Sequence, residues 1–302
     1  MPNDNPVPRV EKLDLCIYHS PCTDGFTAAY LFQTWFPDAN FYPASYDDSR
    51  LNVDWWLSLV KGKHVVCVDF SFPRAITIAL KEAAASLLVL DHHQTSAVEL
   101  RGLDCCYLDD SHSGAMLAWK ALRGEEEPAQ IAKYVQDQDL FTWKLPNSRH
   151  ICARLNSTTY DYAAWAAFAA KLEDPTATKE LAREGAVIKE AFLLTAKEIV
   201  TKAEAWTIAG QRVLVVNSAA PMRAEVAAQL VDYSKRWLRD EFPCVASYYI
   251  KDGVSFWSLR TARSDFSVEK IASSYYGGGG HKAAAGFSVP VYRLDFTRRR
   301  VA

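Results

Sequence analysis

The sequence has no long apolar segment. Its 302 residues include no run of roughly 18 consecutive apolar residues, the length that a membrane-spanning helix needs. The first ten residues contain several prolines and lack the apolar core of a secretory signal. We therefore expect neither a membrane span nor a signal peptide.

The sequence also lacks an excess of charge of either sign. It has 34 basic and 36 acidic residues, which give a formal net charge of −2. Tight binding to duplex nucleic acid or to an anionic membrane surface draws on a strong basic field, which this balance does not supply. A polyanionic ligand must therefore be held by a local site.

The seven cysteines have neither the paired spacing of a zinc ribbon nor that of a disulfide framework, and their number is odd. Scattered cysteines of this kind are typical of a reducing compartment, so we expect a cytoplasmic protein. They stand at Cys16, Cys22, Cys67, Cys105, Cys106, Cys152 and Cys244.

The sequence does contain enough apolar material for a sizeable core, because 49% of its residues are hydrophobic. Single cores stop growing at about 250–300 residues, so a chain of this length is expected to form two domains. We predict a first domain over residues 1–175, a helical connector over residues 176–205 and a smaller α/β domain over residues 206–302.

In the first half of the chain, β-prone runs alternate with helical patterns. Runs at 13–18, 64–69 and 86–90 are separated by helical patterns at 25–36 and 73–84. This alternation is typical of βαβ units, so the predicted fold class is α/β with a parallel sheet. Ligands of such sheets gather at the carboxyl ends of the strands.

The connector is rich in Ala, Leu, Lys and Glu, and Asp174 and Pro175 before it are typical of a helix start. Gly185 interrupts the pattern at a cost of about 1 kcal/mol relative to alanine, which leaves open whether the helix is unbroken. Alternating patterns then return, as expected for a second α/β domain: strands at 212–216, 245–250 and 254–259, and helices at 224–237 and 268–275.

Acidic and imidazole side chains follow three predicted strands of the first domain. An Asp-His-His run at 91–93 follows an apolar strand directly, Asp69 ends another, and the polar cluster at 19–25 follows the first. A carboxylate beside two imidazoles suits Mn²⁺ or a similar divalent ion. Taken singly, each motif also fits a structural role: a strand-ending acid with solvated histidines, a helix cap or an ordinary turn.

Two further motifs lie downstream. Asp137 and Asp139 follow a helical pattern, where polar punctuation of a helix end is the plainer interpretation. A run of four glycines at 277–280 precedes His281, and Arg260 stands on a predicted strand before it. Consecutive glycines let backbone amides approach a phosphate closely, so we favour an anion site over a flexible loop.

In this order along the chain, the motifs together resemble the DHH phosphoesterase family, and the resemblance runs over most of the sequence. The most specific part is the run at 277–287, which is similar to the glycine-rich (GGGH) signature of that family's C-terminal substrate-binding domain. The chain looks most like the exonuclease and oligoribonuclease type of member. The resemblance implies a catalytic, metal-binding first domain and a substrate-binding second domain.

The resemblance also implies a cofactor and roles for individual residues. The cofactor would be Mn²⁺, with Mg²⁺ or another divalent ion as the alternative, bound as one or two ions. If two ions bind, Asp69 would bridge them. His93 would be a catalytic or phosphate-contacting imidazole that Asp91 helps to orient. The implied metal ligands are His19, Asp24, Asp69, His92 and Asp137, and the implied substrate-binding residues are Arg260, Gly278, Gly279, Gly280 and His281.

One position departs from the family's pattern. Members commonly have an aspartate two residues before the one that matches Asp24, and this chain has Cys22 there. A thiolate is a softer ligand and suits manganese poorly, which leaves open whether one ion binds or two.

Three functions remain in competition. The leading hypothesis is a phosphodiesterase, exonuclease-like, acting on short single-stranded oligonucleotides. The second is a nucleotide phosphatase, pyrophosphatase or polyphosphatase. The third, favoured by Cys22, is a catalytically decayed nucleotide-binding protein.

Overall fold

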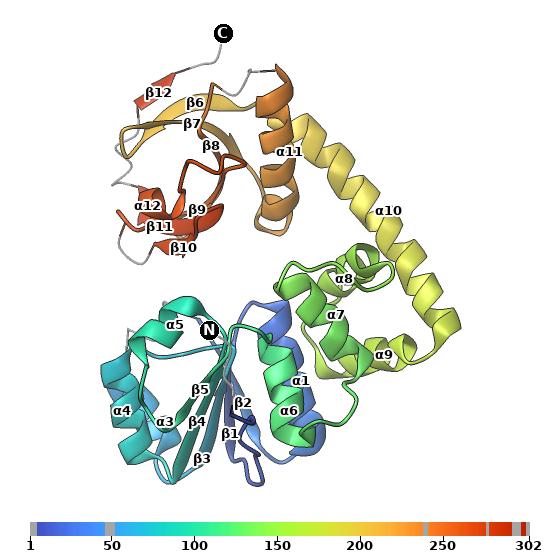
Figure 1. Cartoon of the computed structure of the whole chain (residues 1–302), viewed down its shortest axis with the longest axis vertical. Coiled ribbons are helices and arrows are strands. Elements are labelled where there is room, and N and C mark those ends of the chain that lie inside the picture. Colours follow the sequence, from blue (N-terminus) through green and yellow to red (C-terminus); the bar gives the residue numbers. More distant parts are fainter. Residues whose placement is uncertain (1–4, 46–51, 238–240, 276–277, 292–296, 300–302) are drawn as a thin grey trace. The chain divides into compact units, whose positions relative to one another are not determined.

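The computed structural model describes residues 5–45, 52–237, 241–275, 278–291 and 297–299 (Figure 1). The chain divides into two compact units, residues 1–188 and residues 189–302. Among the helices of these described ranges, none has the length and apolarity that a membrane span requires.

The first unit contains a five-stranded sheet in which every pairing is parallel, which confirms the predicted α/β class. The strand order is β2-β1-β3-β4-β5. Helices cover both faces, so the strands are apolar along most of their length. Their bounds are β1 (Leu15–His19), β2 (Asn40–Ala44), β3 (His64–Val68), β4 (Ser86–Asp91) and β5 (Cys106–Leu108).

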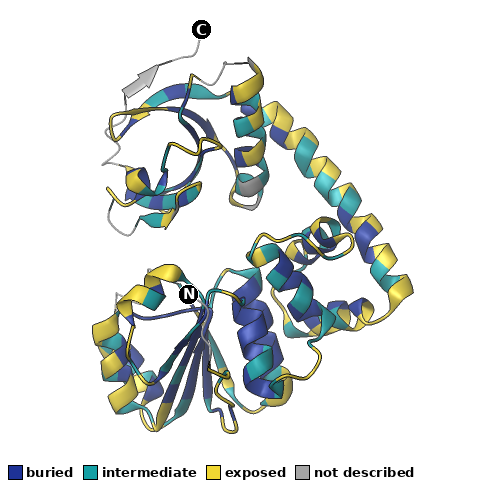
Figure 2. Ribbon diagram, in the orientation of Figure 1, coloured by how far each residue is buried: buried dark blue, intermediate teal, exposed yellow. Residues whose placement is uncertain are grey.

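Successive strand residues enter opposite cores. Val65 and Cys67 of β3 pack on the side of the sheet covered by α3 and α4, whereas Val66 and Val68 pack on the side covered by α1 and α6. Figure 1 shows these helices on the two faces, and Figure 2 shows the buried strands between them. The helices are α1 (Thr23–Trp35), α3 (Val53–Val60), α4 (Arg74–Ala83), α5 (Gln94–Glu99) and α6 (Gly114–Arg123).

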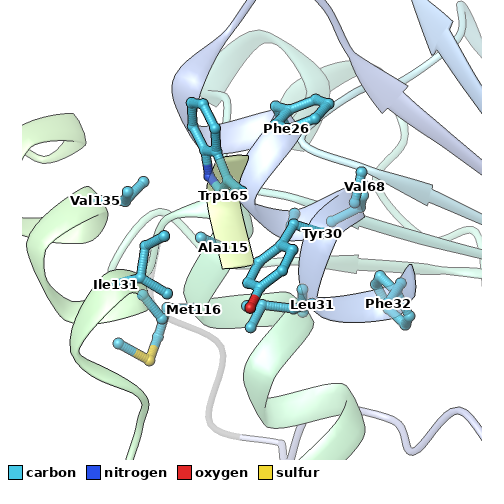
Figure 3. Close-up of a cluster of buried hydrophobic side chains, with 14 of the residues drawn as sticks. Phe26, Tyr30, Leu31, Phe32, Val68, Ala115, Met116, Ile131, Val135 and Trp165 are labelled. Atoms are coloured by element: carbon cyan, nitrogen blue, oxygen red, sulfur yellow. The ribbon is translucent and has the colours of Figure 1, made fainter. Parts of the chain in front are cut away.

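A helical layer packs against α1 and α6. It consists of α7 (Gln130–Asp139), α8 (Ser148–Asn156) and α9 (Tyr162–Leu172). Trp165 of α9 is fully buried beside Phe26 (Figure 3). Its indole N–H donates to Thr27 Oγ1 at 3.0 Å. This layer therefore fixes the position of the helix that begins at the carboxyl end of β1.

The connector forms one unbroken helix, α10 (Pro175–Val200), and the boundary between the two units falls within it. Asp174 caps it, because its Oδ1 accepts from the N–H groups of Thr176 and Ala177 at 2.7 and 2.9 Å. The mid-helix glycine has a tertiary cause. A Cβ on Gly185 would lie 1.8 Å from the carbonyl oxygen of His150 in α8, so only glycine allows this close approach.

The second unit contains a seven-stranded sheet in the order β10-β11-β9-β8-β7-β6-β12, antiparallel except between β7 and β8. Helix α11 packs on one face and α12 on the other. Part of the glycine run forms a strand. The elements are β6 (Glu204–Ile208), β7 (Gln211–Asn217), η1 (Ala220–Met222), α11 (Arg223–Trp237), β8 (Cys244–Lys251), β9 (Val254–Arg260), α12 (Glu269–Ala272), β10 (Gly279–His281), β11 (Ala284–Pro290) and β12 (Thr297–Arg299).

We predict that Gly185→Ala destabilises the protein although alanine is the better helix former. Its methyl group would overlap the α8 backbone, and overpacking of this kind costs about 1–3 kcal/mol. The melting midpoint, followed by circular dichroism, measures the effect. Val187→Ala is the matched control, because Val187 is two residues away and 68% exposed. A midpoint at or above the wild-type value would show that α8 can move away without cost.

Candidate metal centre

The polar side chains at the strand ends of the first unit converge as the parallel sheet predicts. His19 is the last residue of β1, Asp91 is the last of β4, and Asp69 follows β3 directly. Asp69 has a left-handed backbone, with φ of 54°, and its N–H donates to the carbonyl oxygen of Leu90 at 3.0 Å. Such a conformation is uncommon for a residue with a Cβ, so this side chain is placed at the sheet edge by a specific backbone turn.

Asp69 lies at the middle of the cluster. It is 1% exposed. Its Oδ1 is 3.1 Å from Nε2 of His92 and 4.0 Å from Nδ1 of His93, and its Oδ2 is 3.3 Å from Nδ1 of His19. Burial opposes ionisation of this carboxyl group, but hydrogen bonds from His19 and His92 outweigh it and lower the pKa of Asp69. The carboxylate is therefore the charge around which the imidazoles gather.

Asp24 enters the cluster from the first turn of α1. It is buried, and its carboxylate accepts from the N–H groups of Gly114 at 2.6 Å and Ala115 at 2.9 Å, at the start of α6. Its Oδ2 lies 3.6 Å from Nε2 of His92. Burial and the negative charges of Asp69 and Asp139 raise the pKa of Asp24 well above its usual range. A cation bound here would relieve that repulsion.

Two glycines let the helix starts approach the cluster. A Cβ on Gly114 would lie 2.5 Å from Cβ of Asp69, and one on Gly25 would lie 2.3 Å from the carbonyl oxygen of His19. Gly25 was part of the polar cluster singled out in the sequence, but nothing in the sequence marked Gly114 as close to Asp69. Both positions exclude any larger residue without displacement of the backbone.

The structure places one residue of the predicted set away from the cluster. It brings Asp139, not Asp137, into the cluster: Oδ2 of Asp139 lies 3.5 Å from Nε2 of His92. The carboxylate of Asp137 is instead occupied by the loop after α7, where it accepts from Lys144 N at 2.7 Å and Leu145 N at 3.0 Å. Residues two apart on a helix face different directions, so only one of these acids can reach the sheet edge.

Asp91 and His93 form a pair beside the cluster. Asp91 is fully buried, and its Oδ1 is 2.7 Å from Nδ1 of His93 and accepts from the N–H of His92 at 2.7 Å. Ser71 Oγ donates to its other oxygen. The His93 side chain is 35% exposed, so its ring is fixed on one side and accessible on the other. The geometry matches an orienting carboxylate and an imidazole that can meet a ligand.

The two imidazoles favour the charged form where no metal is bound. Burial opposes the positive charge on His92, but the hydrogen bond to Asp69 and the charges of Asp24 and Asp139 raise its pKa to about 10. Burial likewise opposes charge on His93, and Asp91 outweighs it and raises the pKa of His93 to about 9. Neutral imidazole is the metal ligand, so an ion would have to displace these protons.

The donor set fits a divalent metal centre. In each of three groups of side chains the ligand atoms all lie within 4.8 Å of one another; Asp69 belongs to two of the groups, and so does His92. Carboxylate oxygens and imidazole nitrogens suit Mn²⁺ and other divalent first-row ions. The groups are Asp24, His92 and Asp139; His19, Cys22 and Asp69; and Asp69, Asp91, His92 and His93.

Cys22 therefore adjoins the side of the cluster that His19 and Asp69 form. It is the residue before α1. Burial, with the nearby charges of Asp69 and Asp24, raises the pKa of its thiol well above the usual range. A metal ion bound at this side would have to displace the thiol proton.

The predicted substrate-binding residues lie in the second unit. Arg260, at the end of β9, donates through its guanidinium to Ser258 Oγ at 3.0 Å and to the carbonyl oxygen of Leu259 at 2.8 Å. A Cβ on Gly278 would lie 2.0 Å from the carbonyl oxygen of Ala272, and Gly280 has φ of 137°, so both positions require glycine. Gly279 has open space beside it. The side chain of His281 lies outside the described part of the chain.

Comparison with known proteins supports the fold. No family model matches the chain. An uncharacterized protein of Acanthamoeba polyphaga mimivirus is 24% identical over 305 residues, which cover 95% of this chain and 70% of that protein.

Three solved structures have similar folds. RecJ of Thermus thermophilus in complex with Mn²⁺ superimposes with a TM-score of 0.51 at 14% identity, over 91% of this chain and 49% of that chain. The DHH domain of a member of the s1p family of ribosomal proteins superimposes with a TM-score of 0.52 at 13% identity, over 90% of this chain and 81% of that chain. An exopolyphosphatase-related protein from Bacteroides fragilis superimposes with a TM-score of 0.51 at 12% identity, over 92% of this chain and 87% of that chain. The chain thus has a DHH-type two-domain α/β fold.

We predict that Asp139→Asn lowers bound manganese by at least about 10-fold, because it removes a negative ligand from the cluster. Asp137→Asn should keep the metal and lower the melting midpoint, because it disturbs the loop hydrogen bonds. Elemental analysis and thermal unfolding of both variants measure these effects. Loss of manganese from Asp137→Asn at an unchanged midpoint would return the ligand role to Asp137.

We also predict that Cys22→Asp raises manganese occupancy and leaves the protein active, because it adds a hard oxygen ligand beside His19 and Asp69. Elemental analysis of wild type and variant, each loaded with manganese and zinc together, measures the effect. Equal manganese in both, with zinc bound only by the wild type, would show that the thiolate itself coordinates an ion.

Proposed function

We propose that this protein is a Mn²⁺-dependent phosphoesterase that hydrolyses phosphodiester bonds of short single-stranded oligonucleotides from an end. The observation that carries the proposal is the convergence on Asp69. Three carboxylates and the imidazoles of His19 and His92 meet at the carboxyl edge of a parallel sheet, where such folds bind ligands.

The proposed roles follow from the distances. Asp24, Asp69 and Asp139, whose carboxylates lie within 3.6 Å of Nε2 of His92, would hold one ion together with that imidazole, and Asp69 and His19 would hold a second. A bound divalent ion lowers the pKa of a coordinated water and neutralises charge on the phosphate oxygens. The Mn²⁺ in the similar RecJ structure supports this choice of ion.

His93 and Asp91 act on the phosphate in this proposal. The exposed side of the His93 ring offers a positive N–H to a phosphate oxygen, and the buried carboxylate of Asp91 holds the ring at 2.7 Å through Nδ1. Their pairing favours a charged imidazole, which binds an anion better than a neutral one does.

The second unit supplies substrate binding in this proposal. Arg260 provides a guanidinium, and Gly278 and Gly280 provide backbone that other residues could not adopt. With a net charge of −2, the protein has little field for a long polyanion, which supports a short substrate. All seven cysteines are free, which supports a reducing, cytoplasmic location.

A nucleotide phosphatase or pyrophosphatase is the second candidate. The exopolyphosphatase-related structure is as similar in fold as RecJ is, and a divalent metal centre can catalyse either reaction. The third candidate, a decayed nucleotide-binding protein, is disfavoured because the carboxylates of Asp24, Asp69 and Asp139 all lie within 3.6 Å of Nε2 of His92. Assays of a short oligoribonucleotide, an oligodeoxynucleotide, a nucleoside bisphosphate and pyrophosphate with Mn²⁺ separate the first two.

We predict that Asp69→Ala abolishes hydrolysis and removes most bound manganese, because every proposed ligand group includes or adjoins this carboxylate. Arg260→Ala is the contrasting variant, and it should raise KM and keep the metal. Turnover and elemental analysis of both variants measure this. Unchanged turnover in Asp69→Ala would remove the proposed centre, and loss of metal from Arg260→Ala would refute the division of roles.

A further inference from the structure

The loop after α7 presents an exposed aromatic ring on a strained backbone. This aromatic loop, residues 140–147, joins α7 to α8. Phe141 is 73% exposed and has φ of 56°, and Trp143 has φ of 52°. Both values lie in the left-handed region, which bulky residues rarely enter. Strain of this kind persists only where the surroundings impose it, and it gathers at binding sites.

Asp137 holds the aromatic loop in this conformation. Its carboxylate accepts from Thr142 Oγ1 at 2.5 Å, Lys144 N at 2.7 Å and Leu145 N at 3.0 Å. Its carbonyl oxygen accepts from the N–H groups of Thr142 at 3.0 Å and Trp143 at 3.2 Å. One 5%-exposed residue thus fixes the backbone on both sides of Trp143, so the ring of Phe141 is held exposed by the loop.

Arg149 of α8 adds a positive charge beside the rings. Its guanidinium carbon lies 4.5 Å from the ring centre of Trp143 and 5.8 Å from that of Phe141. The two rings meet edge to face, with centres 5.4 Å apart. A guanidinium and an aromatic face together form a surface on which a flat, electron-rich ring of a ligand can stack.

The aromatic loop adjoins the metal centre through the chain. Asp139, whose carboxylate lies 3.5 Å from His92, is two residues before Phe141. Two residues span at most about 7 Å between Cα atoms, so the aromatic loop begins next to the metal centre. A nucleotide bound through its phosphate at the metal centre would therefore have this loop beside it.

Exposed aromatic residues are common, and Trp35 in the same unit shows how Phe141 differs from an ordinary one. Trp35 is 45% exposed, with the guanidinium carbon of Arg123 at 4.3 Å from its ring centre. It lies at the far end of α1 from Asp24, about 16 Å along the helix. It is an ordinary helical residue, so no strained backbone holds it exposed.

We propose that Phe141 stacks on a nucleobase of the substrate, with Arg149 completing the surface and Asp137 as the positioning residue that holds the loop. This inference rests on the proposed function and narrows its substrate class to molecules with a base next to the phosphate at the metal centre. It also gives the hydrogen bonds from the loop to Asp137 a functional role.

The test compares base-bearing and base-free substrates. With Mn²⁺ present, kcat and KM are measured for a dinucleotide and for its abasic analogue, using wild type, Phe141→Ala, Phe141→Trp and the control Trp35→Ala. Phe141→Ala should raise KM for the dinucleotide by about 5-fold to 100-fold and leave the abasic analogue unchanged. Phe141→Trp should retain wild-type KM, and Trp35→Ala should change neither substrate.

A binding titration separates this inference from the proposed function. Manganese-loaded protein is titrated with a nucleoside 5′-monophosphate and with ribose 5-phosphate. This measurement of binding does not depend on turnover. A wild type that hydrolyses none of the substrates would refute the proposed function, and weaker binding of the nucleotide alone by Phe141→Ala would still support stacking. Equal binding of the two ligands by wild type, or equal losses for both in Phe141→Ala, would overturn the inference.

Discussion

Crowding of negative charge at one buried sheet edge is the constraint on which the first unit depends. Asp24, Asp69 and Asp139 approach His92 from a helix start, a strand end and a helix end, and all three lie within 3.6 Å of the same nitrogen, Nε2. Ionised carboxylates this close repel one another strongly where water is scarce. The imidazoles offset part of that repulsion, and a divalent ion would offset the rest. A cluster of this composition costs stability, and groups with strongly shifted pKa values of this kind are concentrated at functional sites.

The surrounding architecture serves to bring these charges together. Gly25 and Gly114 allow two helix starts to approach Asp69, and the amides of α6 donate to Asp24, so the carboxylate is stabilised by a helix N-terminus as well. Strand alternation explains why the edge is reached at all. Within β3, each side chain packs into the core on one face of the sheet or the core on the other. Only at the end of the strand can a side chain contact the helices of both faces.

Much of the first unit could be predicted from the sequence because its signals are local. Alternation of apolar strands and helices fixes a parallel sheet, and a parallel sheet brings His19, Asp69 and the 91–93 run to one edge. The choice between Asp137 and Asp139 could not be made this way, because it depends on where α7 ends and which way its last turn faces. The reason for a glycine at position 185 could not be predicted either, because it is the close approach of the α8 backbone at His150, which is distant in sequence.

The wide sequence separation of the cluster also bears on how the chain folds. Its members come from a helix start at Asp24, a turn at Asp69, a strand end at Asp91 and a helix end at Asp139, so each closes a long loop. Long-range contacts form slowly, because loop entropy is lost before the contacts repay it. We therefore expect the cluster to be among the last parts of the first unit to assemble. A nascent chain exposes its acids singly, and the mutual repulsion arises only when packing of the sheet and of α1, α6 and α7 is already there to oppose it.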